Sequence, residues 1–211
     1  MKALEGIRIA DFSHVMAGPF ASHFLAAMGA EVIKVEPPEG DPVRTMGKHV
    51  DGRSLYAASI LRNKQLVSLD LRKPSARDVV RRLAANCDVV VENFRPGTLE
   101  KWGIGYDELV KKFPRLIYCK VSGFGAEGPL GGFPGYDAIV GAMAGHYSVN
   151  GSKDSGPMRL GLPVVDISMG LYCVIGILLS MHERAASGKG QQIEVTLYDS
   201  ALSLMHPHFP N

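Results

Sequence analysis

The amino-acid sequence predicts an α/β protein of the Rossmann-like class, in which an open parallel sheet is covered by helices on both faces. Short segments rich in valine and isoleucine alternate with helical segments along the chain. The stretches after the predicted strands are rich in Gly, Pro and polar residues, as expected where a parallel sheet binds its ligand. Hydrophobic content of 46% and charged content of 21% in 211 residues are ordinary for a globular enzyme with a sizeable core.

The individual elements follow from local residue patterns. Strands are predicted where short runs of mostly apolar residues occur, at residues 7–12, 31–36, 66–71, 88–93, 116–125 and 191–199. Helices are predicted at residues 19–29, 74–86, within 94–103, 136–145 and 165–187. Pro19 and Pro74 suit the first turn of their helices, and Gly29 ends the first one. The segment PPEGDP predicts a long loop after the second strand.

The last predicted helix contains the longest apolar run of the chain, Met169 to Met181. Because this run is well short of the roughly 20 residues that a membrane span needs, we expect a buried helix and no membrane contact. The N-terminal residues lead directly into a strand and show no secretory signal pattern. Cys87, Cys119 and Cys173 lack CxxC spacing, which indicates reduced thiols in a cytoplasmic protein.

Positive charge is concentrated in the middle of the chain. Residues 44–101 carry 12 basic and 6 acidic side chains, whereas the net charge of the whole chain is only +2. Several of these basic residues fall at predicted strand ends and loops, where an anionic ligand would bind. The segment has neither a long basic run nor interleaved aromatic residues, so it favours a small phosphorylated ligand over nucleic acid.

Two motif matches are rejected because of their context. The stretch GFGAEG at 123–128 matches the dinucleotide-binding pattern, but prolines and glycines follow where a helix would have to begin. We interpret this stretch as a flexible loop that could act as a lid. His206 and His208 have no third ligand at a suitable spacing, so no metal site is expected.

Asp166 is the only acidic residue of the stretch GLPVVDISMG, at the predicted start of the long helix. An aspartate at a helix N-terminus is favoured by about 0.3–1 kcal/mol, so helix capping is the commoner role for it. The same position would also keep a carboxylate ionised and fixed, as a nucleophile requires. Spacing alone leaves both interpretations open.

Seven segments of the chain, taken in order, resemble one enzyme family. They are LEGIRIADFSHVMAGPF, GAEVIKVEPPEGD, SLDLRKP, VVVENFRPGTLEKWG, GYDAIVGAMAG, GLPVVDISMG and SGKGQQIEVTLYDS. Together they are similar to the class III CoA-transferases, the formyl-CoA-transferase-like family that also contains α-methylacyl-CoA racemase. The resemblance begins near Leu4 and extends along the rest of the chain.

The resemblance implies that Asp166 is the covalent nucleophile. In these transferases the matching aspartate attacks a donor acyl-CoA, giving a mixed anhydride and then an aspartyl-CoA thioester, and a carboxylic acid acceptor takes over the CoA. The anhydride keeps the activation of the thioester instead of losing it to water. Coenzyme A is therefore part of donor and product, and no tightly bound cofactor is expected.

The resemblance also implies a CoA-binding rim, in which Lys101 lies near the phosphates and Tyr136 flanks the catalytic acid. The expected contacts are His14, Val15, Met16, Ala17, Leu69, Arg72, Asn93, Phe94, Arg95, Lys101 and Tyr136. Pro37 stands where some relatives have an arginine at the adenine end of CoA, so that contact is not expected here.

Members of this family are much longer than this chain and form interlocked dimers. We therefore expect residues 1–199 to form the large CoA-binding domain and residues 200–211 to begin a linker helix toward a second domain outside this chain. A homodimer, or pairing with a chain that supplies the missing half, would complete the protein.

Three functions stay open: a CoA-transferase or its N-terminal half, an acyl-CoA racemase on the same scaffold, and a non-catalytic CoA-binding fragment. The racemase relatives carry a histidine at the position of Tyr136. Racemisation needs a proton acceptor on each side of the carbon, and a phenol is a poor acceptor at neutral pH. This position favours the transferase.

Overall fold

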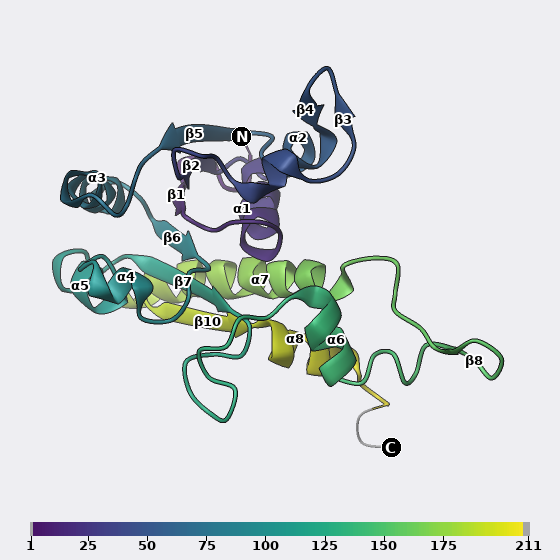
Figure 1. Ribbon diagram of the computed structural model, residues 1–211. Coiled ribbons are helices and arrows are strands. Elements are labelled where there is room, and N and C mark those ends of the chain that lie inside the picture. The colour runs from purple at the N-terminus through teal and green to yellow at the C-terminus, as the bar shows by residue number, and fades with distance from the viewer. Residues whose placement is uncertain (1, 209–211) are drawn as a thin grey trace.

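Six parallel strands form a single sheet in the computed structural model, which describes residues 2–208 (Figure 1). In chain order the strands are β1 (Arg8–Asp11), β2 (Glu31–Glu36), β5 (Lys64–Ser68), β6 (Val89–Glu92), β7 (Ile117–Ser122) and β10 (Gln192–Thr196). Their order across the sheet is β5-β2-β1-β6-β7-β10, and every neighbouring pair is parallel. The predicted fold class is confirmed.

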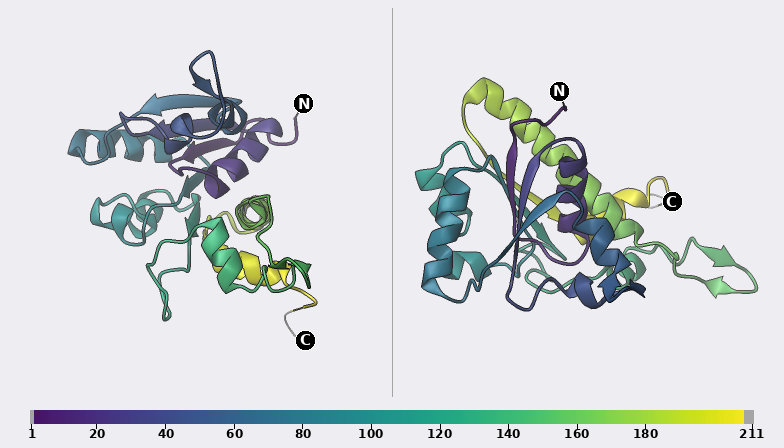
Figure 2. Two further views of the ribbon diagram at one scale, coloured as in Figure 1. Left: turned by 45° about the vertical axis from the view of Figure 1, so that its right-hand side comes forward. Right: turned by 90° about the horizontal axis from the view of Figure 1, so that it is seen from above.

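Helices cover both faces of this sheet, and the right-hand view of Figure 2 shows the strands between two layers of helices. One face carries α1 (Ala17–Ala27), α6 (Asp137–Met143), α7 (Val164–Ser187) and α8 (Leu197–Leu204), and the other carries α3 (Pro74–Ala85), α4 (Thr98–Lys101) and α5 (Tyr106–Lys112). Each face has its own apolar core. The central strands are therefore apolar on both sides, as in β6, where all four residues are buried.

The helices α1 and α7 pack closely because Gly170 has no side chain. A Cβ atom at Gly170 would lie 2.7 Å from Cδ1 of Phe20 and 2.9 Å from the carbonyl oxygen of Ala17. The first turn of α1 therefore packs against the second turn of α7 at the carboxyl edge of the sheet.

By length and composition alone, α7 is long and apolar enough to cross a membrane. Its inner face packs in the core, but the prediction of a buried helix is wrong for its outer face. The exposed apolar residues of that face are Leu171, Tyr172, Ile175, Leu178 and Leu179.

The predicted long loop after β2 contains several short elements. They are η1 (Pro42–Thr45), β3 (His49–Val50), β4 (Arg53–Ser54) and α2 (Leu55–Ile60). The hydroxyl of Ser54 caps α2 by accepting the N–H of Ala57 at 3.1 Å. Val43, Ala57 and Ile60 belong to a small apolar cluster that is separate from the two main cores. Contacts within this cluster, and not a periodic strand pattern, order the segment.

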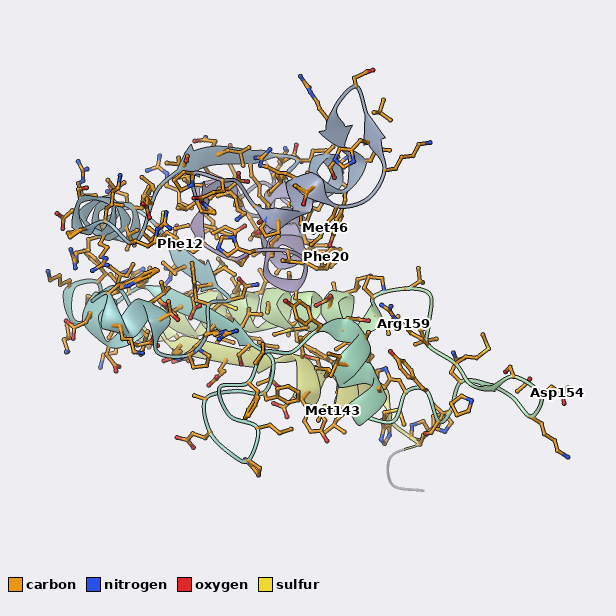
Figure 3. All side chains as sticks on the ribbon, viewed as in Figure 1. Phe12, Phe20, Met46, Met143, Asp154 and Arg159 are labelled. Carbon is orange, nitrogen blue, oxygen red and sulfur yellow. The ribbon has the colours of Figure 1, made fainter. Side chains whose placement is uncertain are left out.

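Two other regions differ from the predicted elements. A hairpin of β8 (Gly151–Ser152) and β9 (Gly156–Pro157) projects from the molecule before α7, with Asp154 at its tip (Figure 3).

The strand β10 ends at Thr196, whose side chain caps α8. The expected domain boundary after residue 199 falls inside α8, whose Leu197 and Ala201 are buried in the core. A second domain beyond this helix stays a prediction.

Candidate active site

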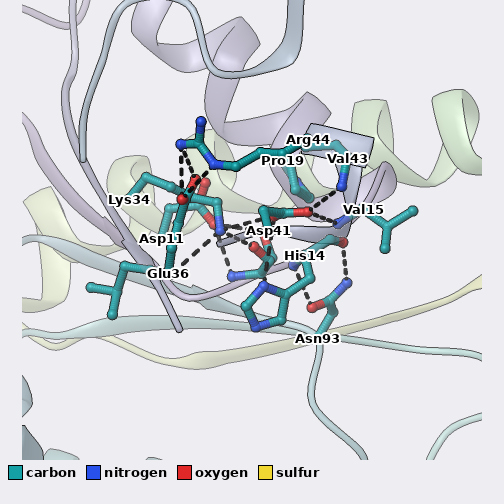
Figure 4. Close-up of polar contacts among 12 residues, drawn as sticks. Asp11, His14, Val15, Pro19, Lys34, Glu36, Asp41, Val43, Arg44 and Asn93 are labelled. Atoms are coloured by element: carbon teal, nitrogen blue, oxygen red, sulfur yellow. Dashed lines mark hydrogen bonds and ion pairs between the residues drawn. The ribbon is translucent and has the colours of Figure 1, made fainter. Parts of the chain in front are cut away.

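The candidate site lies at the carboxyl edge of the sheet, between β1 and β6. At this point the chain order reverses across the sheet, which is where such folds bind their ligands. Asn93 joins the two sides: its Oδ1 accepts the backbone N–H of His14 at 2.8 Å, and its Nδ2 donates to the carbonyl of His14 at 2.8 Å (Figure 4). The loop after β1 is thereby fixed to the loop after β6.

Two adjoining cavities open at this edge, with volumes of about 240 and 250 Å³. Nine of the residues expected at the site line the first: His14, Val15, Met16, Ala17, Asn93, Phe94, Arg95, Tyr136 and Asp166. Leu69 and Arg72 line the second, which shares His14 and Phe94 with the first. Lys101 lines neither cavity and is exposed in the last turn of α4.

Asp166 does not cap its helix. The N-cap position of α7 is Pro163, and Asp166 lies in the first turn with no side-chain hydrogen bond to another described residue. Asp137, the first residue of α6, takes the capping role from outside. Its Oδ2 accepts the backbone N–H groups of Val165 at 2.9 Å and of Asp166 at 3.2 Å. The capping interpretation of Asp166 is therefore wrong, and its carboxylate is left free in the wall of the first cavity.

The surroundings of Asp166 oppose its ionisation. Burial, followed by the negative charge of Asp137, raises the pKa of Asp166 to about 6. The expectation that the helix N-terminus alone would hold the carboxylate ionised is thus incomplete. At pH 7 the carboxylate is still about ten times more abundant than the acid, and its raised basicity suits a nucleophile.

Tyr56 on α2 is a candidate site residue that the sequence analysis missed. Its hydroxyl donates to Sδ of Met16 at 2.8 Å. Burial and the negative charges of Asp166 and Asp41 raise the pKa of Tyr56 to about 12, so the phenol stays protonated as a hydrogen-bond donor. The missed signal is the capped helix α2, which brings this tyrosine against Met16, a residue that lines the first cavity.

The second cavity has an apolar floor and a charged rim. Phe94 separates it from the first cavity, packing edge-on against His14 with centroids 5.3 Å apart and against Trp102 at 6.1 Å. Oε2 of Glu92 holds Phe94 by accepting its backbone N–H at 2.8 Å. On the rim, Nε of Arg72 lies 2.6 Å from Oδ1 of Asp70, so an anionic ligand would have to displace a carboxylate from this guanidinium.

The GFGAEG stretch belongs to a loop, as predicted, and the next helix, α6, begins only at Asp137. A Cβ atom at Gly123 would lie 2.5 Å from the backbone nitrogen of Gly135, so the two ends of the loop touch. Gly132 and Phe133 of this loop line the first cavity. Within residues 2–208, no three His, Cys, Asp or Glu side chains lie together as a metal site would require.

The chain is similar to proteins named as CoA-transferases. It is 41% identical over 211 residues to the succinyl-CoA:D-citramalate CoA-transferase of Chloroflexus aurantiacus, covering 99% of this chain and 52% of that protein. It is 43% identical over 204 residues to the succinate–glutarate CoA-transferase of Agrobacterium fabrum, covering 93% and 51%. The chain thus spans about half the length of these curated relatives.

Solved structures give the same result. A CaiB/BaiF family protein from Brucella suis superposes with a TM-score of 0.93 at 38% identity, over 97% of this chain and 56% of that chain. The protein Rv3272 from Mycobacterium tuberculosis superposes with a TM-score of 0.91 at 35% identity, over 100% and 58%. Residues 4–211 match the family model described as CoA-transferase family III, and the chain belongs to that family.

Proposed function

We propose that this chain provides the nucleophile and the CoA-binding rim of an acyl-CoA:carboxylate CoA-transferase. The observation that carries the proposal is the state of Asp166. An acidic side chain at a helix N-terminus commonly accepts the free backbone N–H groups there. Here Asp137 accepts these N–H groups, and the side chain of Asp166 lines the cavity without a hydrogen bond to another described residue. A half-buried, ionised and unpartnered carboxylate is otherwise costly, so it is expected where it reacts.

The reaction begins when a carboxylate oxygen of Asp166 attacks the thioester carbonyl of the donor. The C–S bond breaks, CoA leaves as the thiolate, and a mixed anhydride remains on Asp166. The thiolate then attacks the Asp166 carbonyl and expels the donor as a free carboxylate. An acceptor carboxylate attacks this aspartyl-CoA thioester and releases the thiolate again, which finally attacks the acceptor carbonyl. Acyl-CoA of the acceptor leaves, and Asp166 is regenerated.

The two cavities match the two ends of an acyl-CoA. The apolar floor of the second cavity suits a flat adenine ring, and Arg72 on its rim suits a phosphate. The pantetheine arm would pass His14 and Phe94 into the first cavity, where its thioester would meet Asp166. Because Pro37 also lines the second cavity, the adenine end has an apolar contact where some relatives have an arginine.

The first cavity also favours the transferase over the racemase. Tyr136 lines it and is 66% exposed, and a tyrosine can donate a hydrogen bond there but is not the kind of base that racemisation needs on each side of the carbon. The relatives' names suggest succinyl-CoA as donor and a dicarboxylate such as glutarate as acceptor. We therefore propose a transferase of this class that acts in the cytoplasm and does not racemise its substrate.

A partner for the chain is proposed from the outer face of α7. Its five exposed apolar side chains lie on one side of the helix, and a contiguous exposed apolar patch of this kind is typical of an interaction surface. A second copy of the chain, or a chain corresponding to the other half of the relatives, would cover it.

Trapping of the acyl-enzyme tests the proposal. The protein is incubated with succinyl-CoA, treated with hydroxylamine and digested for mass spectrometry, and a hydroxamate is expected on Asp166. The D166N variant should give no hydroxamate but should still bind CoA. A hydroxamate at another residue, or substantial transfer of CoA to glutarate by D166N, contradicts the assignment of Asp166.

A further inference from the structure

Asp41, in the loop after β2, is fully buried and contacts four groups at the candidate site (Figure 4). Its Oδ1 accepts the backbone N–H of Val43 at 3.1 Å and of Val15 at 3.3 Å. Its Oδ2 lies 3.2 Å from Nζ of Lys34 and 3.6 Å from Nδ1 of His14. One carboxylate therefore connects the β2 loop to the turn between β1 and α1.

That turn has an unfavourable backbone conformation at Val15. Val15 has a φ of +67°, in the left-handed region that a β-branched side chain strongly disfavours. Within residues 2–208, the other non-glycine residues with positive φ are Asp51 and Asn63, whose types tolerate it. Val15 needs external contacts to stay in this conformation, and Asp41 supplies the acceptor for its N–H.

Lys34 also stabilises this turn, through the residue that precedes His14. Its side chain is fully buried, and its Nζ donates to the carbonyl oxygen of Ser13 at 2.5 Å while pairing with Asp41. A second buried pair, Lys64 with Asp11 at 3.1 Å, lies beside it. Lys34 thus holds the residue before His14, and Asp41 holds the residue after it.

The imidazole of His14 is placed between the two cavities by these contacts. Nδ1 of His14 and Oδ2 of Asp41 are buried and lie 3.6 Å apart. Among the described residues, Oδ2 has its ion pair with Lys34, and Nδ1 has no nearer hydrogen-bonding group than Oδ2. A ring whose Nδ1–H is directed to Asp41 presents Nε2 away from that carboxylate. His14 lines both cavities and keeps 24% of its side-chain surface exposed.

We propose that Asp41, supported by Lys34, is a positioning residue that holds the left-handed turn at Val15 and orients His14, so that the binding rim is set before its ligand arrives. The inference rests on the proposed function only in naming CoA as that ligand. A preformed turn saves the ordering cost that a mobile loop would add to binding.

The test combines Asp41→Ala with Val15→Gly, since glycine adopts a positive φ without a steric cost. Backbone exchange of the turn is followed by hydrogen–deuterium exchange mass spectrometry, and CoA affinity by calorimetry. D41A should speed exchange of the turn at least tenfold and weaken CoA binding about tenfold, which is about 1.4 kcal/mol. Adding V15G to D41A should raise CoA affinity at least threefold above that of D41A alone. The melting temperature should stay low, because the ion pair between Lys34 and Asp41 is still missing.

Two controls keep the result interpretable. D78N removes an exposed carboxylate paired with Arg81 and should leave exchange of the turn and CoA affinity unchanged. If D41A does not fold, K34M/D41A removes both members of the buried pair and takes its place, again with and without V15G. Unchanged affinity and exchange after loss of Asp41, or no recovery with V15G, overturns the inference. Absence of CoA binding by the unaltered protein instead counts against the proposed function, while the exchange comparison still decides the role of Asp41.

Discussion

Replacing Asp166 by asparagine should stabilise the protein at neutral pH while preventing acyl-enzyme formation. Burial and Asp137 raise the pKa of Asp166 from 3.8 to about 6. At about 1.4 kcal/mol per pH unit, the ionised carboxylate costs the folded state at most about 3 kcal/mol, and its partial exposure reduces this to about 1–2 kcal/mol. No side-chain hydrogen bond among the described residues is lost in the variant, because Asp137 provides the cap.

The sign of this effect depends on pH and is checked by thermal unfolding. A folded-state pKa above the unfolded value means that the folded state binds the proton more tightly, so the carboxylate costs nothing below about pH 4 and its full amount above pH 6. D166N should therefore melt about 2–6 °C above the parent at pH 7.5 and together with it at pH 4. D78N serves as the control for loss of a surface carboxylate. Lower stability of D166N at both pH values would refute the reasoning, because it would mean that Asp166 makes a stabilising contact.

Three further predictions concern Asp137, the basic residues of the expected CoA-binding rim, and Tyr136. D137A should lower the free energy of unfolding by about 1–2 kcal/mol, since it removes the acceptor for two helix N–H groups, whereas D137N keeps an acceptor oxygen and should lose less in urea unfolding. R72A should weaken CoA binding roughly tenfold with little change in melting temperature, and K101A, whose residue lines neither cavity, should weaken it less by calorimetry. In heavy water, a 2-methylacyl-CoA should show no enzyme-dependent α-deuteration by NMR, because Tyr136 offers no suitable base; rapid exchange would instead indicate racemase chemistry.

The sheet was predictable because its strands are buried on both faces. A strand such as β6 begins with three consecutive valines, a run that can be recognised without knowing its partners. The elements that escaped prediction lack such a run. The helix α5 is held by charge at its ends, with Asp107 in its first turn and Lys112 in its last, and α2 is held by a serine cap and a small local cluster. Short elements of this kind depend on tertiary contacts more than on local pattern.

The site was only partly predictable, for a different reason. Eleven of the twelve residues expected at the site line the two cavities, because each follows a predicted strand or matches a family segment and parallel strands bring those ends together. Asp137 and Asp41 were not assigned roles, because their partners lie far away in sequence. Asp137 caps a helix that begins 27 residues later, and Asp41 supports a turn 26 residues earlier. A pairing at that separation leaves no periodic trace in one sequence.

Capping by Asp137 leaves the proposed nucleophile, Asp166, at the same helix end without a capping bond. A carboxylate that accepts helix N–H groups is stabilised as the anion, which lowers both its pKa and its basicity as a nucleophile. Those N–H groups are bonded to Asp137 instead. The Asp166 carboxylate is therefore stabilised only by the helix dipole, and the negative charge of Asp137 destabilises it. Asp166 therefore stays mostly ionised at pH 7 and yet more basic than a capping aspartate. We infer that the stability lost by leaving Asp166 unpaired is the physical requirement for its reactivity, so stabilising substitutions at this position should be those that abolish acyl transfer.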